Sequence, residues 1–389
     1  MTESAALPPW NRFAHWPRRL AQLALVLLAA LLVLSAVTPV VTADGPHKSL
    51  LAGGASKADT APRDRDVDLQ LYDRVTQRVR SGQNYYDAVA IEHRATRYPL
   101  RPGFSVRLPT LAVIEAQLPP PADPSTGGKV EAVLASLLAV LVMVAWWRRL
   151  GEEPGGLEAR PAATLLLLAG VQVITIGYFF VLHELWAGGL LALALGLHRP
   201  EQGKWLGALI AAAAAIAIRE HALPFVLLMA TFALWHRRWR EGAAWAALIA
   251  VYIALIAWHL HTVAGLVRPG DPLGASWLTL RGLSGWLSMI VLSSNLRFLP
   301  AALAGPLIVL MLLGWAGCRT GLGAFATLLF LGYGLAFMVA GRIDNWYWGM
   351  TIAPAMWAGL AFVPMALKGL CHAAWHKPGI ATAADKGQV

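Results

Sequence analysis

Long runs of apolar residues recur along the chain and are separated by short polar junctions. A helix needs about 20 mainly apolar residues to cross the hydrocarbon core of a bilayer. Ten runs approach this length, several of them falling short: 21–43, 129–147, 162–177, 184–197, 205–218, 222–235, 243–259, 299–317, 324–340 and 348–370. The pattern predicts an all-α polytopic membrane protein with about ten transmembrane helices.

The polar segment 44–128 stands apart from this pattern. Within it, Leu69 and Tyr72 begin an apolar repeat at helical spacing, and Gly82 is suited to end that helix. Asn84 is suited to cap a second helix. We therefore expect a long loop that contains amphipathic helices lying at the membrane interface, as is typical of short apolar helices outside the bilayer core.

The basic residues cluster at the ends of the apolar runs on one side of the predicted membrane. By the positive-inside rule, that side is the cytoplasm. The expected organisation is a cytoplasmic N-terminus at 1–20, a first transmembrane helix at 21–43, a periplasmic loop at 44–128, transmembrane helices two to ten within 129–370, and a cytoplasmic tail at 371–389.

The composition narrows the function classes. Hydrophobic residues make up 57% of the chain and charged residues 14%, against about 25% charged in soluble domains. The net charge is +10, but the basic residues do not form a stripe with interleaved aromatic residues on a soluble element. Nucleic-acid binding is therefore not expected. CxxC, HExxH, GxxxxGK[ST] and strand-borne GxGxxG patterns do not occur, so neither ATP hydrolysis nor nicotinamide chemistry is supported.

Acidic residues alternate at the start of the first predicted loop helix, as Asp64, Asp66 and Asp68. A carboxylate at a membrane face can take a proton from a hydroxyl, bind a metal ion, or serve as a solvated or capping charge. The residues alone leave these roles open.

Polar junctions on the same predicted side hold the other candidate residues. Ionisable groups at helix junctions are costly unless they face water or a partner. Arg219 and Arg342 lie where positive charge is usually depleted, and a guanidinium binds phosphate through paired hydrogen bonds. For Arg219, an ion pair with Glu184 or Glu220 is the alternative. The full set of candidate cavity residues is His183, Glu184, Glu220, His221, Arg107, Asp344, Asn345 and Tyr347.

In this layout the chain resembles the membrane glycosyltransferases of the GT-C superfamily, in a bacterial branch. The resemblance rests on the long first outer loop with its acidic residue. It rests also on short motifs at 68–72, 82–86, 98–102 and 106–112, and on the late stretch 342–349.

The resemblance implies an inverting transfer of a sugar from a polyprenyl-phosphate donor to an envelope glycan or lipid acceptor. The reaction would occur at the periplasmic face of the bacterial inner membrane. Asp68 would be the general base. Many members carry two adjacent acidic residues at this place, whereas here acidic residues occur at every second position, and Asp66 is therefore the second candidate. Arg219 and Arg342 would hold the donor phosphate. The resemblance implies no required cofactor, and a divalent cation is optional in that superfamily.

Other classes stay open. A lipid or solute transporter or flippase would favour ionisable residues at mid-membrane depth. An O-antigen-ligase-like glycan transferase would place its catalytic loop late, where 259–297 carries three arginines. A non-catalytic scaffold is a further alternative. The enzyme hypothesis expects Asp68, Glu184, Arg219 and Arg342 to line one outward cavity. It fails if the four side chains scatter over separate surfaces.

Overall fold

The computed structural model describes residues 8–42, 45–46 and 66–375. Apart from one antiparallel pair of two-residue strands and a few isolated bridges, the regular structure in these ranges is helical. Six helical segments there are long and apolar enough to cross a membrane: Arg18–Val37, Lys129–Glu152, Leu157–Thr175, Trp239–Leu266, Gly321–Val339 and Ala353–Trp375. The all-α class with membrane-length helices is confirmed. The ten-span topology stays a prediction.

The long segments are built from α1 (Arg18–Val37), α5 (Lys129–Glu152), α6 (Gly156–Val171), α10 (Trp239–Leu266), α13 (Gly321–Val339) and α15 (Val363–Trp375). The shorter apolar helices are α7 (His183–Leu197), α8 (Leu206–Ile218), α9 (Leu223–Trp235), α11 (Gly282–Leu292) and α12 (Ala301–Gly317). The 3₁₀ helices between them include η4 (Gln172–Thr175), η5 (Gly177–Phe179), η6 (Pro200–Gln202), η7 (Glu220–Ala222) and η8 (Asn295–Phe298), and η3 (Gly103–Ser105) lies in the long first loop.

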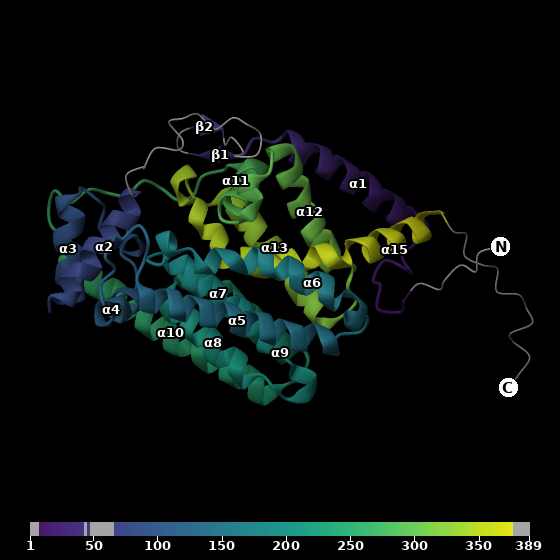
Figure 1. Cartoon of the computed structure of the whole chain (residues 1–389), viewed down its shortest axis with the longest axis horizontal. Helices are drawn as coiled ribbons and strands as arrows, with labels where there is room; N and C mark the ends of the chain where they lie inside the picture. Colours follow the sequence, from purple (N-terminus) through teal and green to yellow (C-terminus); the bar gives the residue numbers. More distant parts are fainter. Residues whose placement is uncertain (1–7, 43–44, 47–65, 376–389) are drawn as a thin grey trace, which may run out of the picture.

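Three loop helices form a cap at one end of the bundle, on the left in Figure 1: α2 (Val67–Arg80), α3 (Tyr85–Ala95) and α4 (Thr110–Gln117). Gly82 ends α2 with a φ of +93°, a left-handed conformation that favours glycine. The Asn84 side chain accepts a hydrogen bond from the Tyr86 amide and caps α3. Both loop helices predicted from the sequence are therefore confirmed.

The cap has a hydrophobic core of its own, which includes Leu71, Val75 and Val89. Val263, near the end of α10, packs into the same core and fastens the cap to the bundle. The opposite face of α2 presents Leu69 to the main core. The cap is thus a packed extension of the helical bundle, which fixes the side chains of α2 relative to the membrane helices.

The helix α7 lies at the centre of the main core and is buried on nearly all sides. Such a helix needs apolar or small residues around its whole circumference. Gly188 is one of them: a Cβ there would lie 2.0 Å from the Met350 carbonyl oxygen. This close approach brings the start of α7 against the 3₁₀ segment η9 (Ile343–Thr351).

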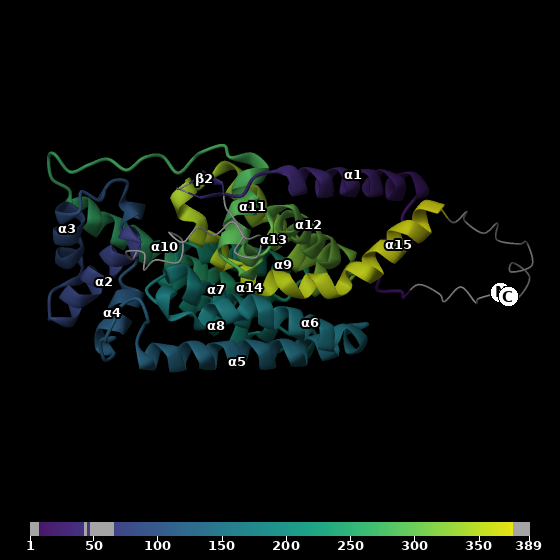
Figure 2. The ribbon, with the colours of Figure 1, turned by 45° about the horizontal axis from the view of Figure 1, so that its top comes forward.

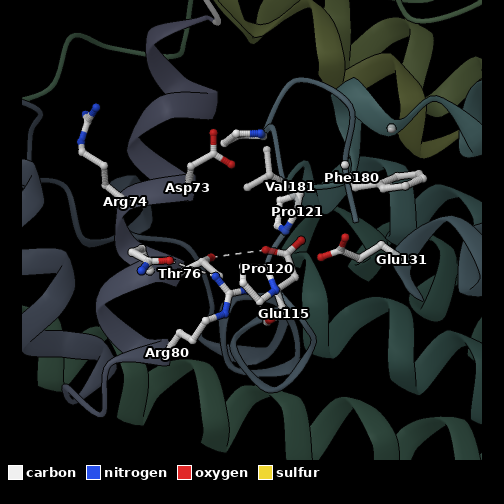
Figure 3. A pocket seen from close by; sticks show the side chains of 14 residues that line it. Asp73, Arg74, Thr76, Arg80, Glu115, Pro120, Pro121, Glu131, Phe180 and Val181 are labelled. Atoms are coloured by element: carbon white, nitrogen blue, oxygen red, sulfur yellow. Dashed lines mark hydrogen bonds between the residues drawn. The ribbon is translucent and has the colours of Figure 1, made fainter. Parts of the chain in front are cut away.

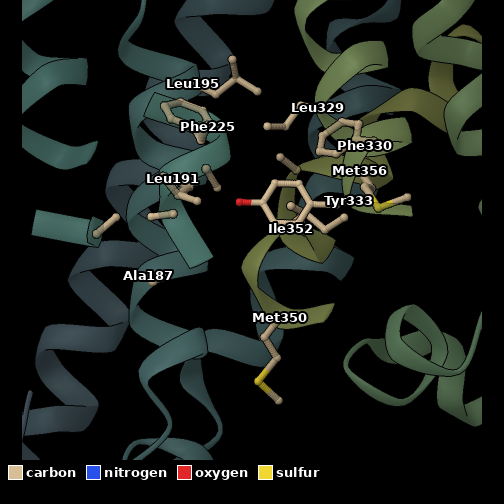
Figure 4. Packing of buried hydrophobic residues seen from close by; sticks show 14 of the residues in the cluster. Ala187, Leu191, Leu195, Phe225, Leu329, Phe330, Tyr333, Met350, Ile352 and Met356 are labelled. Carbon is tan, nitrogen blue, oxygen red and sulfur yellow. The ribbon is translucent and has the colours of Figure 1, made fainter. Parts of the chain in front are cut away.

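Side chains from α7, α9 and α13 interlock beside this contact (Figure 4). Leu191, Phe225 and Phe330 belong to the main cluster of buried residues. Within it, the Tyr333 hydroxyl donates a hydrogen bond to the His221 carbonyl oxygen in the junction between α8 and α9. The core therefore holds that junction in place as well as the start of α7.

The structure corrects the predicted boundaries of the first membrane helix. α1 ends at Val37 rather than at residue 43, because Thr38 precedes Pro39 and takes an extended conformation. The strand β1 (Val41–Thr42) then pairs antiparallel with β2 (Gly45–Pro46). The start of α1 and the end of α15 lie together, at the end opposite the cap (Figures 1 and 2).

The last predicted span, 348–370, is a broken helix rather than a continuous one. It consists of η9, α14 (Ala353–Met356), η10 (Trp357–Phe362) and α15, with Pro354 and Pro364 at the starts of the two α-helical parts. The predicted tail at 371–389 begins inside α15, and residues 376–389 lie outside the described part of the chain.

Candidate functional site

Asp68 sits in the first turn of α2 and is half-buried. Its Oδ2 accepts a hydrogen bond of 2.9 Å from the hydroxyl of Tyr347 in η9. Burial is the main cause that raises the pKa of Tyr347, and the nearby Tyr72 and Asp68 act in the same direction. The Tyr347 hydroxyl therefore stays protonated and acts as a donor. This hydrogen bond therefore links the first loop to the polar stretch 342–349.

Tyr72 lies one helical turn after Asp68 and continues the site into the protein. Its hydroxyl accepts a hydrogen bond of 3.0 Å from Arg107 Nε, and both side chains are buried. Burial raises the pKa of Tyr72 to about 12, although the charge of Arg107 acts in the opposite direction. The edge of the Tyr72 ring packs against His183, with 5.4 Å between the ring centroids.

His183 and Glu184 begin α7 and are both buried, rather than lying at a wet interface. Glu184 Oε1 lies 2.7 Å from Arg219 Nη2, and that arginine is 0% exposed. Arg219 Nη1 also donates to Glu220, and Nη2 lies 3.5 Å from His221 Nε2. Two carboxylates therefore engage Arg219, in the ion pairs that the sequence offered as the alternative to phosphate binding.

Arg342 lies at the solvent edge of the same region, and its side chain is 27% exposed. It makes a two-pronged contact with Asp344, with distances of 3.2 Å from Nε and 3.0 Å from Nη2. The Asn345 side chain accepts from the Arg342 amide at 3.1 Å and fixes the turn. Burial raises the pKa of Tyr98 in the first loop, and the charges of Asp68 and Arg342 act on this pKa in opposite directions.

The structure thus brings most of the predicted site residues together. The connected set comprises Asp68, Arg107, His183, Glu184, Arg219, Glu220, His221 and Tyr347. Arg342 and Asp344 lie at its solvent edge, and the buried Asn345 side chain holds the turn beneath them. Asp66 is exposed just before α2, where its amide donates to the Tyr178 hydroxyl at 3.2 Å. Asp64 lies outside the described residues.

Sequence reasoning missed Tyr72, which links Asp68 to the buried groups. Its position four residues after Asp68 on a predicted helix was the signal, because residues at this spacing share a helix face. Trp348 was also missed as a contact of the site, since its ring packs edge-on against His221 with 4.4 Å between centroids.

In the described part of the chain, the expected outward cavity lined by Asp68, Glu184, Arg219 and Arg342 is not found, because Glu184 and Arg219 are buried in an ion pair. Two other cavities flank the site, and none of these four residues lines either of them. A void of about 10 Å³, the volume at which a cavity holds one water molecule, is lined by Tyr72, Arg107 and His183 among other residues. A larger pocket of about 260 Å³ opens on the neighbouring face of α2 (Figure 3). Thr76, Glu115 and Val181 line both cavities, so the larger pocket adjoins the site through these three side chains.

Among the residues that the structure describes, no three His, Cys, Asp or Glu side chains are grouped so as to hold a metal ion. No family model, curated protein or solved structure matches the chain. The site combines an oriented, half-buried carboxylate at Asp68, a partly exposed guanidinium at Arg342 and a buried charge network around Arg219.

Proposed function

We propose that the protein is an inverting glycosyltransferase of the bacterial inner membrane. It would move a sugar from a polyprenyl-phosphate donor to an envelope glycan or lipid acceptor at the periplasmic face. The observation that carries the proposal is the hydrogen bond from Tyr347 to Asp68. A general base must be held in one orientation and remain within reach of the acceptor, and Asp68 is half-buried as well as anchored.

In the proposed reaction, the oxygen of an acceptor hydroxyl attacks the anomeric carbon of the donor sugar. The bond between that carbon and the phosphate oxygen breaks, and the phosphate leaves with the electron pair. Asp68 takes the hydroxyl proton, and attack opposite the leaving group inverts the anomeric configuration. General base catalysis of this kind contributes about 10²–10⁴-fold in rate.

The two predicted phosphate-binding arginines have different surroundings. Arg219 is completely buried and paired with Glu184 and Glu220, which supports a role in holding the site together. Arg342 is partly exposed at the rim, and its Asp344 partner is 49% exposed. Even with two contacts, this pair is open to solvent, so a phosphate can reach the guanidinium and compete with Asp344 for it. We therefore assign the donor phosphate to Arg342, where it would stabilise the charge that grows on the leaving group.

A lipid or solute transporter is the second candidate. The observation that favours it is the buried Glu184–Arg219 pair at a helix junction, because buried charges and interrupted helices are typical of transport pathways. The break between α6 and η4 and the broken last segment fit the same pattern. The half-buried Asp68 outside the membrane-length helices favours the transferase.

Glycan analysis of a clean deletion strain tests the proposal. Complementation with the wild-type gene should restore a sugar that is missing from an envelope glycan or lipid. Asp68→Asn should fail to restore it, while Asp66→Asn should restore it and serves as the matched control. Unchanged envelope glycans and lipids in the deletion strain would contradict the proposal, and a loss of solute or lipid transport in that strain would favour the transporter.

A further inference from the structure

The larger pocket lies between the cap and the start of α5 (Figure 3). Its walls come from α2, from α4, from the proline-rich linker and from the segment just before His183. At about 260 Å³ it falls just below the roughly 300–1,000 Å³ of pockets that hold drug-sized ligands, which suits a ligand of about one ring. The lining residues are Asp73, Arg74, Thr76, Gln77, Arg80, Glu115, Pro120, Pro121, Pro124, Gly127, Glu131, Gly177, Phe180 and Val181.

Two buried carboxyl groups, those of Glu115 and Glu131, point toward one another in this pocket (Figure 3). Each residue is only 6% exposed, and neither makes an ion pair in the described part of the chain. Glu115 accepts a hydrogen bond of 3.3 Å from the Thr76 hydroxyl. Burial, together with the nearby charge of Glu131, raises the pKa of Glu115, so its carboxyl can donate as well as accept.

Glu131 folds back over the start of α5, where a Cβ at Gly128 would lie 1.9 Å from its Oε2. Such a position lets a glutamate shield the first amides of its helix. The Gly128 backbone interacts with this carboxyl group, but the buried Oε2 makes no hydrogen bond of normal geometry within the described residues. Since a buried polar atom without a partner costs free energy, this oxygen is an acceptor to which a ligand hydroxyl can donate.

The charges around the pocket disfavour an ionic ligand. An anion would meet the carboxyl groups of Asp73, Glu115 and Glu131. Two arginines also line the pocket, and both already have partners. Arg74 is held by Glu92 at 2.9 Å, and Arg80 donates to the Glu115 carbonyl oxygen at 2.8 Å and to the Gln77 side chain at 3.1 Å. A metal ion would need a closer set of ligands, and no group of three suitable side chains occurs in the described residues. A neutral molecule with several hydroxyl groups fits both the donors and the acceptors that line the walls.

We propose that this pocket binds one neutral sugar ring of the acceptor, with hydroxyls bonded to Glu115 and Glu131 and an apolar ring face against Phe180. This inference rests on the proposed function and names the acceptor as a glycan. Asp73 and Asp68 are five residues apart on α2, which is about 7.5 Å along the helix axis and about 140° around it. The pocket and the proposed base therefore lie on neighbouring faces of α2, and an acceptor that reaches both must have more than one ring and pass around this helix.

Ligand binding to the full-length protein in nanodiscs tests the inference. The probes are the methyl glycosides of glucose, galactose, mannose, rhamnose and arabinose, and saturation-transfer NMR reports binding. Gln77 is an exposed residue of the pocket wall, so Gln77→Trp should fill the pocket without disturbing buried groups. Ile91→Trp is the matched control, because Ile91 is exposed on α3 and lies outside the pocket.

We expect at least one glycoside to bind the wild type and the Ile91→Trp variant, and to lose at least 10-fold in affinity with Gln77→Trp. Glu115→Ala should lose a similar amount, while Glu115→Gln keeps part of the binding. The inference is overturned if no glycoside binds, or if Gln77→Trp binds as the wild type does. Glycosyl transfer by the Gln77→Trp variant at the wild-type rate would remove the pocket inference alone, whereas pocket binding in a protein without transferase activity would remove only the proposed function.

Discussion

The hydroxyl of Tyr347 donates a 2.9 Å hydrogen bond to Asp68 Oδ2, although 279 residues separate the two side chains. The contact ties the first turn of α2 to the 3₁₀ segment that follows α13. A single directed hydrogen bond fixes the orientation of the carboxylate and still leaves Asp68 half-buried rather than enclosed. This relationship makes Asp68 the strongest candidate for the base among the described acids of the first loop.

Tyr347→Phe should lower kcat for glycosyl transfer by about 10-fold and leave KM nearly unchanged. The expected size corresponds to one lost hydrogen bond to a charged group, about 1.5 kcal/mol. Steady-state kinetics of the purified variant would measure it. Tyr178→Phe is the control, because it removes a hydroxyl that contacts the Asp66 amide instead. Equal losses in both variants would argue against a specific role for Tyr347.

Arg342→Ala should weaken binding of the lipid-linked donor and raise its KM by about 10–100-fold, as expected for losing a charge-assisted contact. Arg148→Ala provides a control, since Arg148 is an exposed arginine at the other end of α5 from the cap. Asp344→Ala should bind the donor at least as well as the wild type, because it frees the guanidinium. An unchanged donor KM in Arg342→Ala would remove Arg342 from the phosphate site.

Glu184→Ala should destabilise the protein, since it leaves Arg219 buried with only Glu220 as a carboxylate partner. Breaking a buried ion pair costs about 3–5 kcal/mol, and the remaining partner places this case at the lower end. The double variant Glu184→Leu with Arg219→Met should lose less stability than Glu184→Ala. Thermal unfolding in detergent would measure both, and Glu158→Ala serves as an exposed control. A melting temperature unchanged by Glu184→Ala would show that the pair is not structural.

The pH dependence of the cap can be predicted from His93, which is 3% exposed in α3. Burial lowers the pKa of His93 from 6.5 to about 4, so the unfolded chain takes up a proton before the folded cap does. Stability is therefore highest above pH 6.5 and falls as the pH drops toward 4. At about 1.36 kcal/mol per pKa unit, the loss is about 3 kcal/mol.

His93→Phe should reduce this pH dependence, because phenylalanine fills the same buried position without titrating. Thermal unfolding between pH 7 and pH 4 would measure the difference between variant and wild type. The hydrogen bond from His93 Nδ1 to the Pro99 carbonyl oxygen is lost in the variant, so the comparison concerns the slope with pH and not the absolute stability. Identical slopes would exclude His93 as the titrating group.

Local signals in the sequence predicted the cap well. Gly82 and Asn84 mark the boundary between α2 and α3. Glycine readily takes the left-handed conformation that ends α2, and asparagine is a favoured N-cap residue. Pro39 also indicates that α1 ends just before it. The apolar run continues past this proline, and the predicted helix was therefore extended too far. Boundaries set by one residue are therefore easily lost in hydropathy runs.

The buried helix α11 was missed because its 11 residues are too few to span a bilayer and were taken for part of an outer loop. Its residues from Gly285 to Leu292 are all buried, so the protein itself replaces the lipid around it. The partners of Arg219 were foreseen only as alternatives, since spacing along the chain does not show which carboxylate lies across a helix junction. The contact between Asp68 and Tyr347 depends wholly on tertiary packing and had no local signal.

The most direct test of the central claim is the stereochemistry and rate of sugar transfer by the purified protein in nanodiscs. A panel of polyprenyl-phosphate sugars serves as donors, and NMR determines the anomeric configuration of the product. We predict a product of inverted configuration with at least one donor, and a rate at least 100-fold lower for Asp68→Asn, in the range expected for loss of a general base. A product of retained configuration, an Asp68→Asn variant as active as the wild type, or no transfer from any donor would contradict the account.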